Sequence, residues 1–301
     1  MKILIFIVIM GILNLSAVAQ EVHFKTSDSV DLYVKVAGKG TPCLYIHGGP
    51  GSGSYWVEKF AGDILEQNMQ IIYVDQRGVG RSSSPANGDF SPGRLILDFE
   101  EIRKSLGIKQ WLTMGHSFAG VIQIKYALEN TDVIKGMLMF NCAVYLHQGK
   151  EVLQKAYELI NEPEYEKYLN DSVPVDVAIN KLYSRLRKKK LFWKMGYAEQ
   201  SSEEKMTASF REIPKWNKDY ENKAMSYPEV WIDYRPLTEK LKMPVLFFYG
   251  KTDWMAGPNN YKGVNFPNMI LWGSDVGHVP FIENKPDLEK AIKRYLSRYK
   301  F

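Results

Sequence analysis

Cysteine is scarce in this sequence, which has only Cys43 and Cys142 among 301 residues. Disulfide scaffolds, structural zinc clusters and iron–sulfur sites all need more thiolates at short spacing, so we expect none of them and no metal site. The two cysteines fall at the start of one expected strand and at the end of another. In a parallel sheet these positions lie at opposite edges, beyond the roughly 7 Å over which a disulfide can join two Cα atoms. Both thiols are therefore expected to be free.

A strong charge of one sign is also missing. The sequence has 39 Lys and Arg against 34 Asp and Glu, a formal net charge of +5. Nucleic-acid-binding proteins usually concentrate basic residues on one face or in a recognisable module, so we expect no nucleic-acid partner. With 45% hydrophobic and only 24% charged residues, the chain has enough apolar sequence for a large core and too little charge for disorder.

The N-terminal apolar run is too short to span a membrane. Ile3–Leu13 has about half of the roughly 20 residues that a spanning helix needs. Lys2 precedes the run, and the small residues of Ala17–Ala19 follow it in the pattern that a signal peptidase accepts. The sequence therefore predicts a signal peptide at residues 1–19, cleavage before Gln20, and export to a periplasm or out of the cell. No cysteine stands directly after the cleavage site to carry a lipid, so we expect no stable membrane anchor afterwards.

Alternating strand and helix patterns indicate the fold class. Eight runs are typical of strands: Glu21–Lys25, Asp31–Val36, Cys43–His47, Ile71–Asp75, Trp111–Gly115, Gly136–Cys142, Val245–Gly250 and Met269–Gly273. Four helical patterns lie between or after them: Ser54–Gln67, Pro92–Leu106, Phe118–Leu128 and Pro286–Tyr299. Most of the later strands are near-continuous apolar stretches, as expected for strands covered on both faces. After a short antiparallel-looking start, this order predicts an α/β protein with a mostly parallel, doubly wound, eight-stranded sheet.

One connection is far longer than the others. Cys142 and Met243 enclose about 100 residues, whereas a crossover between parallel strands needs only a dozen or more. The interval is helical-looking and rich in aromatic residues. We therefore expect a core at residues 20–144 and 243–301, with a helical cap inserted at residues 145–242. A helical decoration with no role in a site is the alternative.

A serine stands in a motif typical of a nucleophile. Ser117 is at the centre of Gly115–Gly120, which follows an expected strand and precedes an apolar helix pattern. A serine between small residues at such a turn forms a nucleophile elbow, because the tight turn has no room for large neighbours and holds the hydroxyl above the sheet at the helix N-terminus. The alternative is a serine that merely caps the helix.

A serine nucleophile needs a base, which an acid in turn orients. The five histidines are His23, His47, His116, His147 and His278. Only His278 lies in a loop between a late strand and the last helix, so it is the predicted base. Asp253 follows the strand Val245–Gly250 and is the predicted acid, which gives the chain order nucleophile, acid, histidine. Asp275 is a rival acid by its proximity to His278, but we expect it to cap or turn the loop.

Acyl transfer also needs hydrogen-bond donors for the developing oxyanion. His47–Gly51 follows the third expected strand, and its glycines let backbone N–H groups approach a substrate oxygen closely. We assign the oxyanion hole to the amides of Gly49 and Phe118. A plain glycine turn is the alternative.

With these motifs the chain resembles the α/β-hydrolase superfamily, and specifically its proline iminopeptidase (prolyl aminopeptidase) branch. The resemblance rests on His47–Gly51, on Asp75–Ser82, on the elbow at Ser117 and on the loops of Asp253 and His278. It covers the expected core, from about residue 21 to 144 and from 243 to 301. The first two motifs together are fairly specific for the branch, whereas the loops of the triad are shared across the superfamily.

The resemblance implies a serine hydrolase that needs no cofactor. Ser117 would attack an acyl carbon, His278 would carry the proton, and Asp253 would hold the imidazole tautomer. The implied substrate is a short peptide from which an N-terminal proline or another small residue is released. Asp75 and Arg77 correspond to a structural turn of the family, where we expect their side chains to hydrogen-bond to each other and to neighbouring backbone.

Two departures from the branch leave the substrate open. The branch has Trp and then Gly after the nucleophile, whereas Phe118 and Ala119 stand here, closer to general esterases and lactonases. A carboxylic ester hydrolase or lactonase acting on small acyl substrates is therefore the alternative. A non-catalytic homologue that uses the cap as a ligand platform is the second alternative.

The charged residues of the cap form the other departure. The branch holds the substrate's amino group with cap glutamates, and the candidates here cannot be matched individually: Glu199, Glu203, Glu204, Glu212, Glu229 and Asp233. Most of them are expected on solvated helix faces. The basic run is also expected to be solvated surface: Arg185, Arg187, Lys188, Lys189 and Lys190.

Overall fold

The computed structural model describes residues 20–146, 150–213 and 215–301; the expected signal peptide and His147 lie outside these ranges. The centre is an eight-stranded sheet in the order β1-β2-β4-β3-β5-β6-β7-β8. Its strands are β1 (Gln20–Lys25), β2 (Asp31–Ala37), β3 (Thr41–Ile46), β4 (Met69–Val74), β5 (Trp111–His116), β6 (Ile134–Phe140), β7 (Val245–Gly250) and β8 (Met269–Ser274). Strand β2 pairs antiparallel with β1 and β4, and all other pairs are parallel. The predicted sheet is confirmed.

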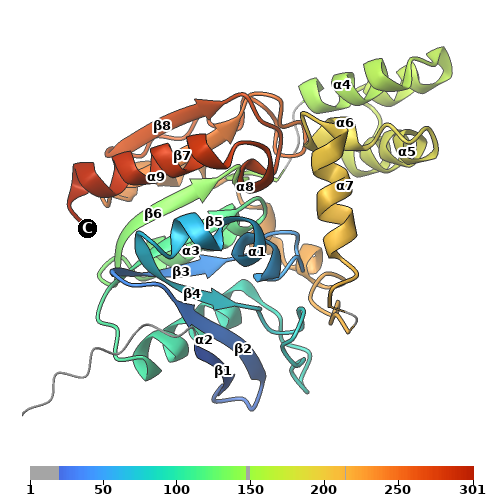
Figure 1. Ribbon diagram of the computed structural model, residues 1–301. Coiled ribbons are helices and arrows are strands. Elements are labelled where there is room, and N and C mark those ends of the chain that lie inside the picture. Colours follow the sequence, from blue (N-terminus) through green and yellow to red (C-terminus); the bar gives the residue numbers. More distant parts are fainter. Residues whose placement is uncertain (1–19, 147–149, 214) are drawn as a thin grey trace, which may run out of the picture.

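Helices cover both faces of the sheet (Figure 1). Helices α1 (Tyr55–Leu65), α8 (Pro280–Glu283) and α9 (Lys285–Tyr299) pack on one face, and α2 (Pro92–Ser105) and α3 (Ala119–Glu129) on the other. Successive strand residues point to opposite faces, so each parallel strand contributes to two cores. In β3, for example, Cys43 and Tyr45 face α1 and α9, whereas Leu44 and Ile46 face α2 and α3.

Helix starts follow from their local sequence. Pro92 opens α2, where its missing N–H costs nothing, and the Ser91 hydroxyl accepts a hydrogen bond from the Arg94 N–H at 3.3 Å. Asn284 caps α9 in the same way, with its Oδ1 accepting from the Asp287 N–H at 3.2 Å. Among the described residues, no helix has the length and apolar character to cross a membrane.

A helical insertion lies between β6 and β7 and stands beyond the carboxyl ends of the parallel strands (Figure 1). Its helices are α4 (Lys150–Ile160), α5 (Val175–Lys188), α6 (Trp193–Gly196) and α7 (Gln200–Ser209), with 3-10 turns η1 (Pro163–Leu169), η2 (Ala224–Ser226), η3 (Pro228–Trp231) and η4 (Arg235–Lys240). The insertion has its own apolar cluster, centred on Ala156, Leu182 and Met195. The predicted helical insert is therefore present, and we call it the cap.

Both cysteines are free, as predicted, and the structure places both in the core. Cys43 belongs to the core under α1 and α9, and Cys142 to the core on the opposite face of the sheet. Burial raises the pKa of both thiols well above the usual range. Neither thiol is therefore suited to act as a nucleophile.

The expected hydrogen bond between Asp75 and Arg77 is wrong. Asp75 accepts from the Ser54 N–H at 2.8 Å and from Arg81 Nε at 2.7 Å. Gly78 and Gly80, with φ of 68° and 59°, turn the loop so that Arg81 rather than Arg77 reaches Asp75. The carboxylate thus joins the loop after β4 to the start of α1.

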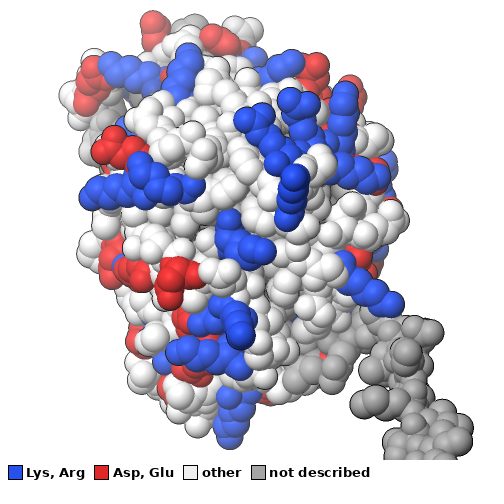
Figure 2. Space-filling view, turned by 90° about the vertical axis from the view of Figure 1, so that its left-hand side faces the viewer, with Lys and Arg blue, Asp and Glu red and all other residues white. Residues whose placement is uncertain are grey.

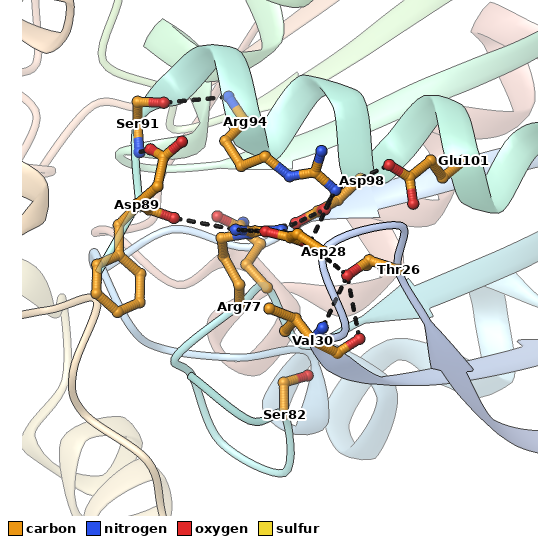
Figure 3. A network of polar contacts seen from close by, with 12 residues as sticks. Thr26, Asp28, Val30, Arg77, Ser82, Asp89, Ser91, Arg94, Asp98 and Glu101 are labelled. Atoms are coloured by element: carbon orange, nitrogen blue, oxygen red, sulfur yellow. Dashed lines mark hydrogen bonds and ion pairs between the residues drawn. The ribbon is translucent and has the colours of Figure 1, made fainter. Parts of the chain in front are cut away.

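Arg77 points to the other side of the loop and lies between two carboxylates (Figure 3). Its Nε donates to Asp98 on α2 at 2.6 Å, and its Nη1 donates to Asp28 in the β1–β2 turn at 2.9 Å. Arg94 donates to Asp98 and to Glu101 at 2.9 and 2.8 Å. The hydrogen bonds from Arg77 hold the pKa of Asp28 well below its usual range. This network ties the turn to α2.

The surface carries both signs of charge. On the face that Figure 2 shows, Lys and Arg side chains gather at the upper right and are mixed with Asp and Glu lower down. The absence of a nucleic-acid partner stays a prediction.

Candidate active site

Ser117 lies in a sharp turn between β5 and α3. Its φ is 59°, a backbone conformation that a non-glycine residue adopts only when its surroundings impose it. The turn is packed against backbone: a Cβ on Gly120 would lie 2.2 Å from the Ala143 carbonyl oxygen, and one on Gly48 would lie 2.3 Å from the carbonyl oxygen of His116. The small residues of the motif are therefore required by close contact, as the nucleophile elbow predicts.

The structure brings the three predicted triad residues together. His278 Nε2 is 2.8 Å from Ser117 Oγ, and His278 Nδ1 is 2.9 Å from Asp253 Oδ2. Because a carboxylate only accepts hydrogen bonds, Nδ1 carries the proton and Nε2 is free to accept from the serine hydroxyl. This is the arrangement in which a serine can lose its proton to a histidine.

Asp253 is buried and surrounded by donors. Its Oδ1 accepts from the N–H groups of Met255 and Ala256 at 2.9 and 3.1 Å, and its Oδ2 also accepts from Asn141 Nδ2 at 2.9 Å. Burial alone would raise the pKa of Asp253, but His278 and these donors together lower it. The rival acid Asp275 is exposed and accepts from Lys251 Nζ at 2.9 Å.

The backbone of His278 is held from two sides. Its N–H donates to the Gly196 carbonyl of the cap at 2.7 Å. Its carbonyl accepts from Nε2 of His116 at 2.7 Å, and the two imidazole rings lie 4.8 Å apart. Burial and the nearby His278 lower the pKa of His116 to about 3. His116 is therefore a neutral donor, a role that its position beside Ser117 did not reveal in the sequence.

Gly277, directly before His278, is held in the same way. Its carbonyl accepts from Asn141 Nδ2 at 2.8 Å, and its N–H donates to Glu283 on α8. The second oxygen of Glu283 accepts from the N–H of Ala198 in the cap at 2.6 Å. Glu283 thus links the cap to the loop of the predicted base. The sequence does not reveal Glu283 or the role of Asn141, because most of their partners are far away along the chain.

The two predicted oxyanion donors lie beside the serine. Gly49, with φ of 115°, and Phe118, at the start of α3, line the same cavity as Ser117 and His278. Within residues 20–146, 150–213 and 215–301, neither backbone N–H donates to a protein acceptor. Both amides are therefore available to a substrate oxygen. His47 in the same motif is buried, and its Nε2 accepts from the Gln76 N–H at 3.1 Å, so it supports the loop.

The cavity at Ser117 has a volume of about 890 Å³ and is mainly apolar. The cap contributes Val175, Ile179, Met225 and Trp231 to its lining. None of the six carboxylates considered above is among the described residues that line it. Asp176, in the first turn of α5, does line it. The sequence offered no motif that singled out this residue.

A second cavity of about 550 Å³ adjoins the first at His278 and Met255. Its walls are aromatic and charged: Arg187, Lys190, Phe192, Trp193, Tyr197, Glu203 and Phe210.

The described residues contain no group of three or more His, Cys, Asp or Glu side chains that could hold a metal ion.

Comparison with known families agrees with the fold. A family model described as the alpha/beta hydrolase fold matches residues 41–285. The match covers most of the chain, which therefore belongs to the α/β-hydrolase fold family.

Within that family, the relatives include proline iminopeptidases. Those of Neisseria gonorrhoeae and Arabidopsis thaliana are 31% identical over 120 residues and 30% identical over 133 residues. These matches cover 39% and 43% of this chain and 38% and 34% of the relatives, so the chain spans less than half the length of either relative. The expected family and its distant proline iminopeptidase relatives are confirmed.

Solved structures show the same architecture over nearly the whole chain. The proline iminopeptidase-related protein from Thermus thermophilus superposes with a TM-score of 0.75 at 20% identity, covering 93% of this chain and 97% of that one. An esterase from Exiguobacterium antarcticum superposes with a TM-score of 0.67 at 19% identity, covering 92% and 100%. At such identities the likeness shows the fold alone.

Proposed function

We propose that this protein is a serine hydrolase that acts through an acyl-enzyme. The observation that carries the proposal is the hydrogen-bonded row Ser117–His278–Asp253, with distances of 2.8 and 2.9 Å, at a cavity with two available amides. Ser117 Oγ attacks the acyl carbon while His278 Nε2 takes its proton. The Gly49 and Phe118 amides stabilise the oxyanion.

The second half of the cycle uses the same groups. His278 delivers the proton to the leaving atom, which departs and leaves the acyl group on Ser117. Water then attacks the acyl carbon, with His278 taking its proton. His278 returns that proton to Ser117 as the acid is released. The ionised Asp253 keeps Nδ1 protonated and stabilises the imidazolium in both halves.

The proposed substrate is a short peptide whose N-terminal proline, or another small residue, is released. The motifs His47–Gly51 and Asp75–Ser82 and the relatives named proline iminopeptidases support this choice. The carboxylate of Asp176 in the Ser117 cavity supplies a partner for the substrate's ammonium group.

Turnover of Pro-β-naphthylamide beside p-nitrophenyl acetate, by protein starting at Gln20, tests the proposal. We expect the wild-type protein to hydrolyse the amide and the Ser117→Ala variant to lose this activity. Asp176→Asn should raise KM for the amide about tenfold, the effect of one charged hydrogen bond, and leave KM for the ester unchanged. Amide turnover that survives in Ser117→Ala would remove the mechanism.

An ester hydrolase or lactonase is the second candidate, favoured by the apolar lining of the 890 Å³ cavity and by Phe118 and Ala119 after the serine. Ester turnover without any amide turnover would select it and keep the triad. Failure of Ser117 to react with a fluorophosphonate would instead favour the non-catalytic homologue that binds ligands with its cap.

Export to a periplasm or to the medium is part of the proposal, supported by the N-terminal sequence pattern. The expected mature protein starts at Gln20. Fractionation of cells followed by N-terminal sequencing tests it, and a full-length chain retained in the cytoplasm would contradict it.

A further inference from the structure

The second cavity lies on the base side of the site. It contains His278 and Val279 in its lining but not Ser117, and it meets the Ser117 cavity at His278 and Met255. In the proposed reaction the leaving atom must receive its proton from His278 Nε2. The part of a substrate beyond the scissile bond therefore starts at His278. The second cavity is the space that this part can enter.

Two cations face this cavity, and they belong to the basic run expected to be solvated surface. The run divides into two pairs. Arg185 and Lys189, four residues apart, both pair with Glu162. Arg187, in the last turn of α5, and Lys190, beyond its end with φ of 58°, line the cavity instead.

The two cations lack a carboxylate partner in the described part of the chain. No Asp or Glu oxygen among the described residues is within 4.0 Å of either side chain, as an ion pair requires. The Arg187 guanidinium lies over the Phe192 ring, 4.2 Å from its centroid, which fixes its position without neutralising its charge.

One carboxylate also lines the cavity. Glu203 on α7 accepts a hydrogen bond from the Thr207 hydroxyl of the same helix at 2.9 Å. Two cations and one anion leave the cavity with a net positive charge. A positive cavity attracts a negatively charged ligand, and guanidinium and ammonium groups are the usual partners of a carboxylate.

We propose that this cavity receives the leaving group and that Arg187 and Lys190 bind a carboxylate on it. The peptide identity of the substrate rests on the proposed function. For a peptide, the carboxylate is the free C-terminus. The protein would then be selective for very short peptides, with the N-terminal residue at Ser117 and the C-terminal carboxylate at α5.

The first test compares Pro-Phe with Pro-Phe amide, which differ only in the C-terminal charge. We expect the free acid to have a kcat/KM about tenfold higher. The double variant Arg187→Gln/Lys190→Gln should abolish this preference and leave turnover of the amide within about twofold, because neither residue contacts the reacting atoms. Lys188→Gln is the matched control and should keep the preference, because Lys188 is an exposed cation of the same basic run that does not line the cavity.

A second test does not depend on peptide cleavage. It compares 4-acetoxybenzoate with methyl 4-acetoxybenzoate, whose leaving groups differ by one negative charge. The kcat/KM for 4-acetoxybenzoate, divided by that for its methyl ester, should be about tenfold lower in the double variant than in the wild type. Comparing this ratio between the two proteins cancels the intrinsic reactivity of the two esters.

The two tests separate the two claims. A lower ratio for the two benzoate esters in the double variant, with no cleavage of either peptide by the wild type, would support the anionic leaving-group cavity and overturn the proposed aminopeptidase activity. Unchanged ratios in the double variant, for peptides and esters alike, would overturn the cavity's role while leaving the hydrolase mechanism intact.

Discussion

His116 contacts the predicted base without reaching the substrate cavity. It precedes Ser117 in sequence, and its Nε2–H donates to the carbonyl of His278 at 2.7 Å. The low pKa of about 3 keeps it uncharged beside the imidazole of His278. A cation at that distance would oppose formation of the imidazolium that the proposed mechanism requires. His116 therefore acts as a positioning residue.

Replacing His116 tests this role. His116→Leu leaves the His278 carbonyl without its donor, a loss of about 1–3 kcal/mol, and we expect kcat for p-nitrophenyl acetate to fall about tenfold or more with little change in KM. His116→Gln, whose amide N–H can replace the imidazole donor, should recover most of kcat. Steady-state kinetics of both variants, beside their melting temperatures, measure the effect. Full kcat in His116→Leu would contradict it.

The residues of the candidate site differed in how far the sequence revealed them. Ser117, Asp253 and His278 could be predicted because each stands in a loop directly after a strand, in a recognisable order. Asn141 and Asp253 are 112 residues apart, and their contact exists only because β6 and β7 are neighbours in the sheet. Asp176 could not be singled out, because only the packing of α5 over the cavity distinguishes it from other helical carboxylates.

At the scale of elements, the short helix α6 connects the cap to the loops of the predicted acid Asp253 and the predicted base His278. Its Met195 carbonyl accepts from the Trp254 N–H at 2.8 Å, next to Asp253, and its Gly196 carbonyl accepts from the His278 N–H at 2.7 Å. Glu283 adds a third connection through Ala198. The position of the cap and the position of the base are therefore coupled.

Breaking the third connection should lower turnover more than stability. In Glu283→Ala the N–H groups of Ala198 and Gly277 lose their acceptor, so the base loop is held less firmly and we expect a severalfold lower kcat. Glu289→Ala is the control, because half-buried Glu289 on α9 pairs with Lys293 and with no other cation among the described residues. Kinetics and thermal unfolding of the two variants measure the difference. Equal kcat values for the two would refute the coupling.

The element boundaries also show what a sequence can determine. The strand ends matched within two residues, because most of the strands are short apolar runs between turns, a strong local signal. The side-chain partners in the loop after β4 had no such signal. The turn with positive φ at Gly78 and Gly80 places Arg81 beside Asp75. The sequence alone is compatible with several pairings of these charged side chains.

For the molecule as a whole, stability at the antiparallel end of the sheet depends on buried charge. Arg77 is fully buried, and its two carboxylate partners come from the β1–β2 turn and from α2. Removing one of the two partners is costly, because the buried guanidinium has lost water and keeps only the other carboxylate as a counter-ion.

Asp28→Asn should reveal this contribution and its pH dependence. Because the folded protein lowers the pKa of Asp28, its contribution is present above the ordinary value of 3.8 and is lost as the pH falls below that value. We expect the variant to lose about 2 kcal/mol of unfolding free energy at pH 7. The difference in unfolding free energy between the variant and the wild type should become smaller in acid. Urea unfolding at pH 7, 5 and 3 measures it. Asp31→Asn, which removes an exposed pair with His23, should change it by less than about 1 kcal/mol.

The reactivity of the two buried thiols can report local opening of the protein. Cys43 and Cys142 lie in the two cores on opposite faces of the sheet, so a thiol reagent can reach each one only when the layer above it opens. Two single Cys→Ala variants would leave one reporter per layer. Alkylation rates would then show whether the two helical layers separate from the sheet together or in sequence, without any added label.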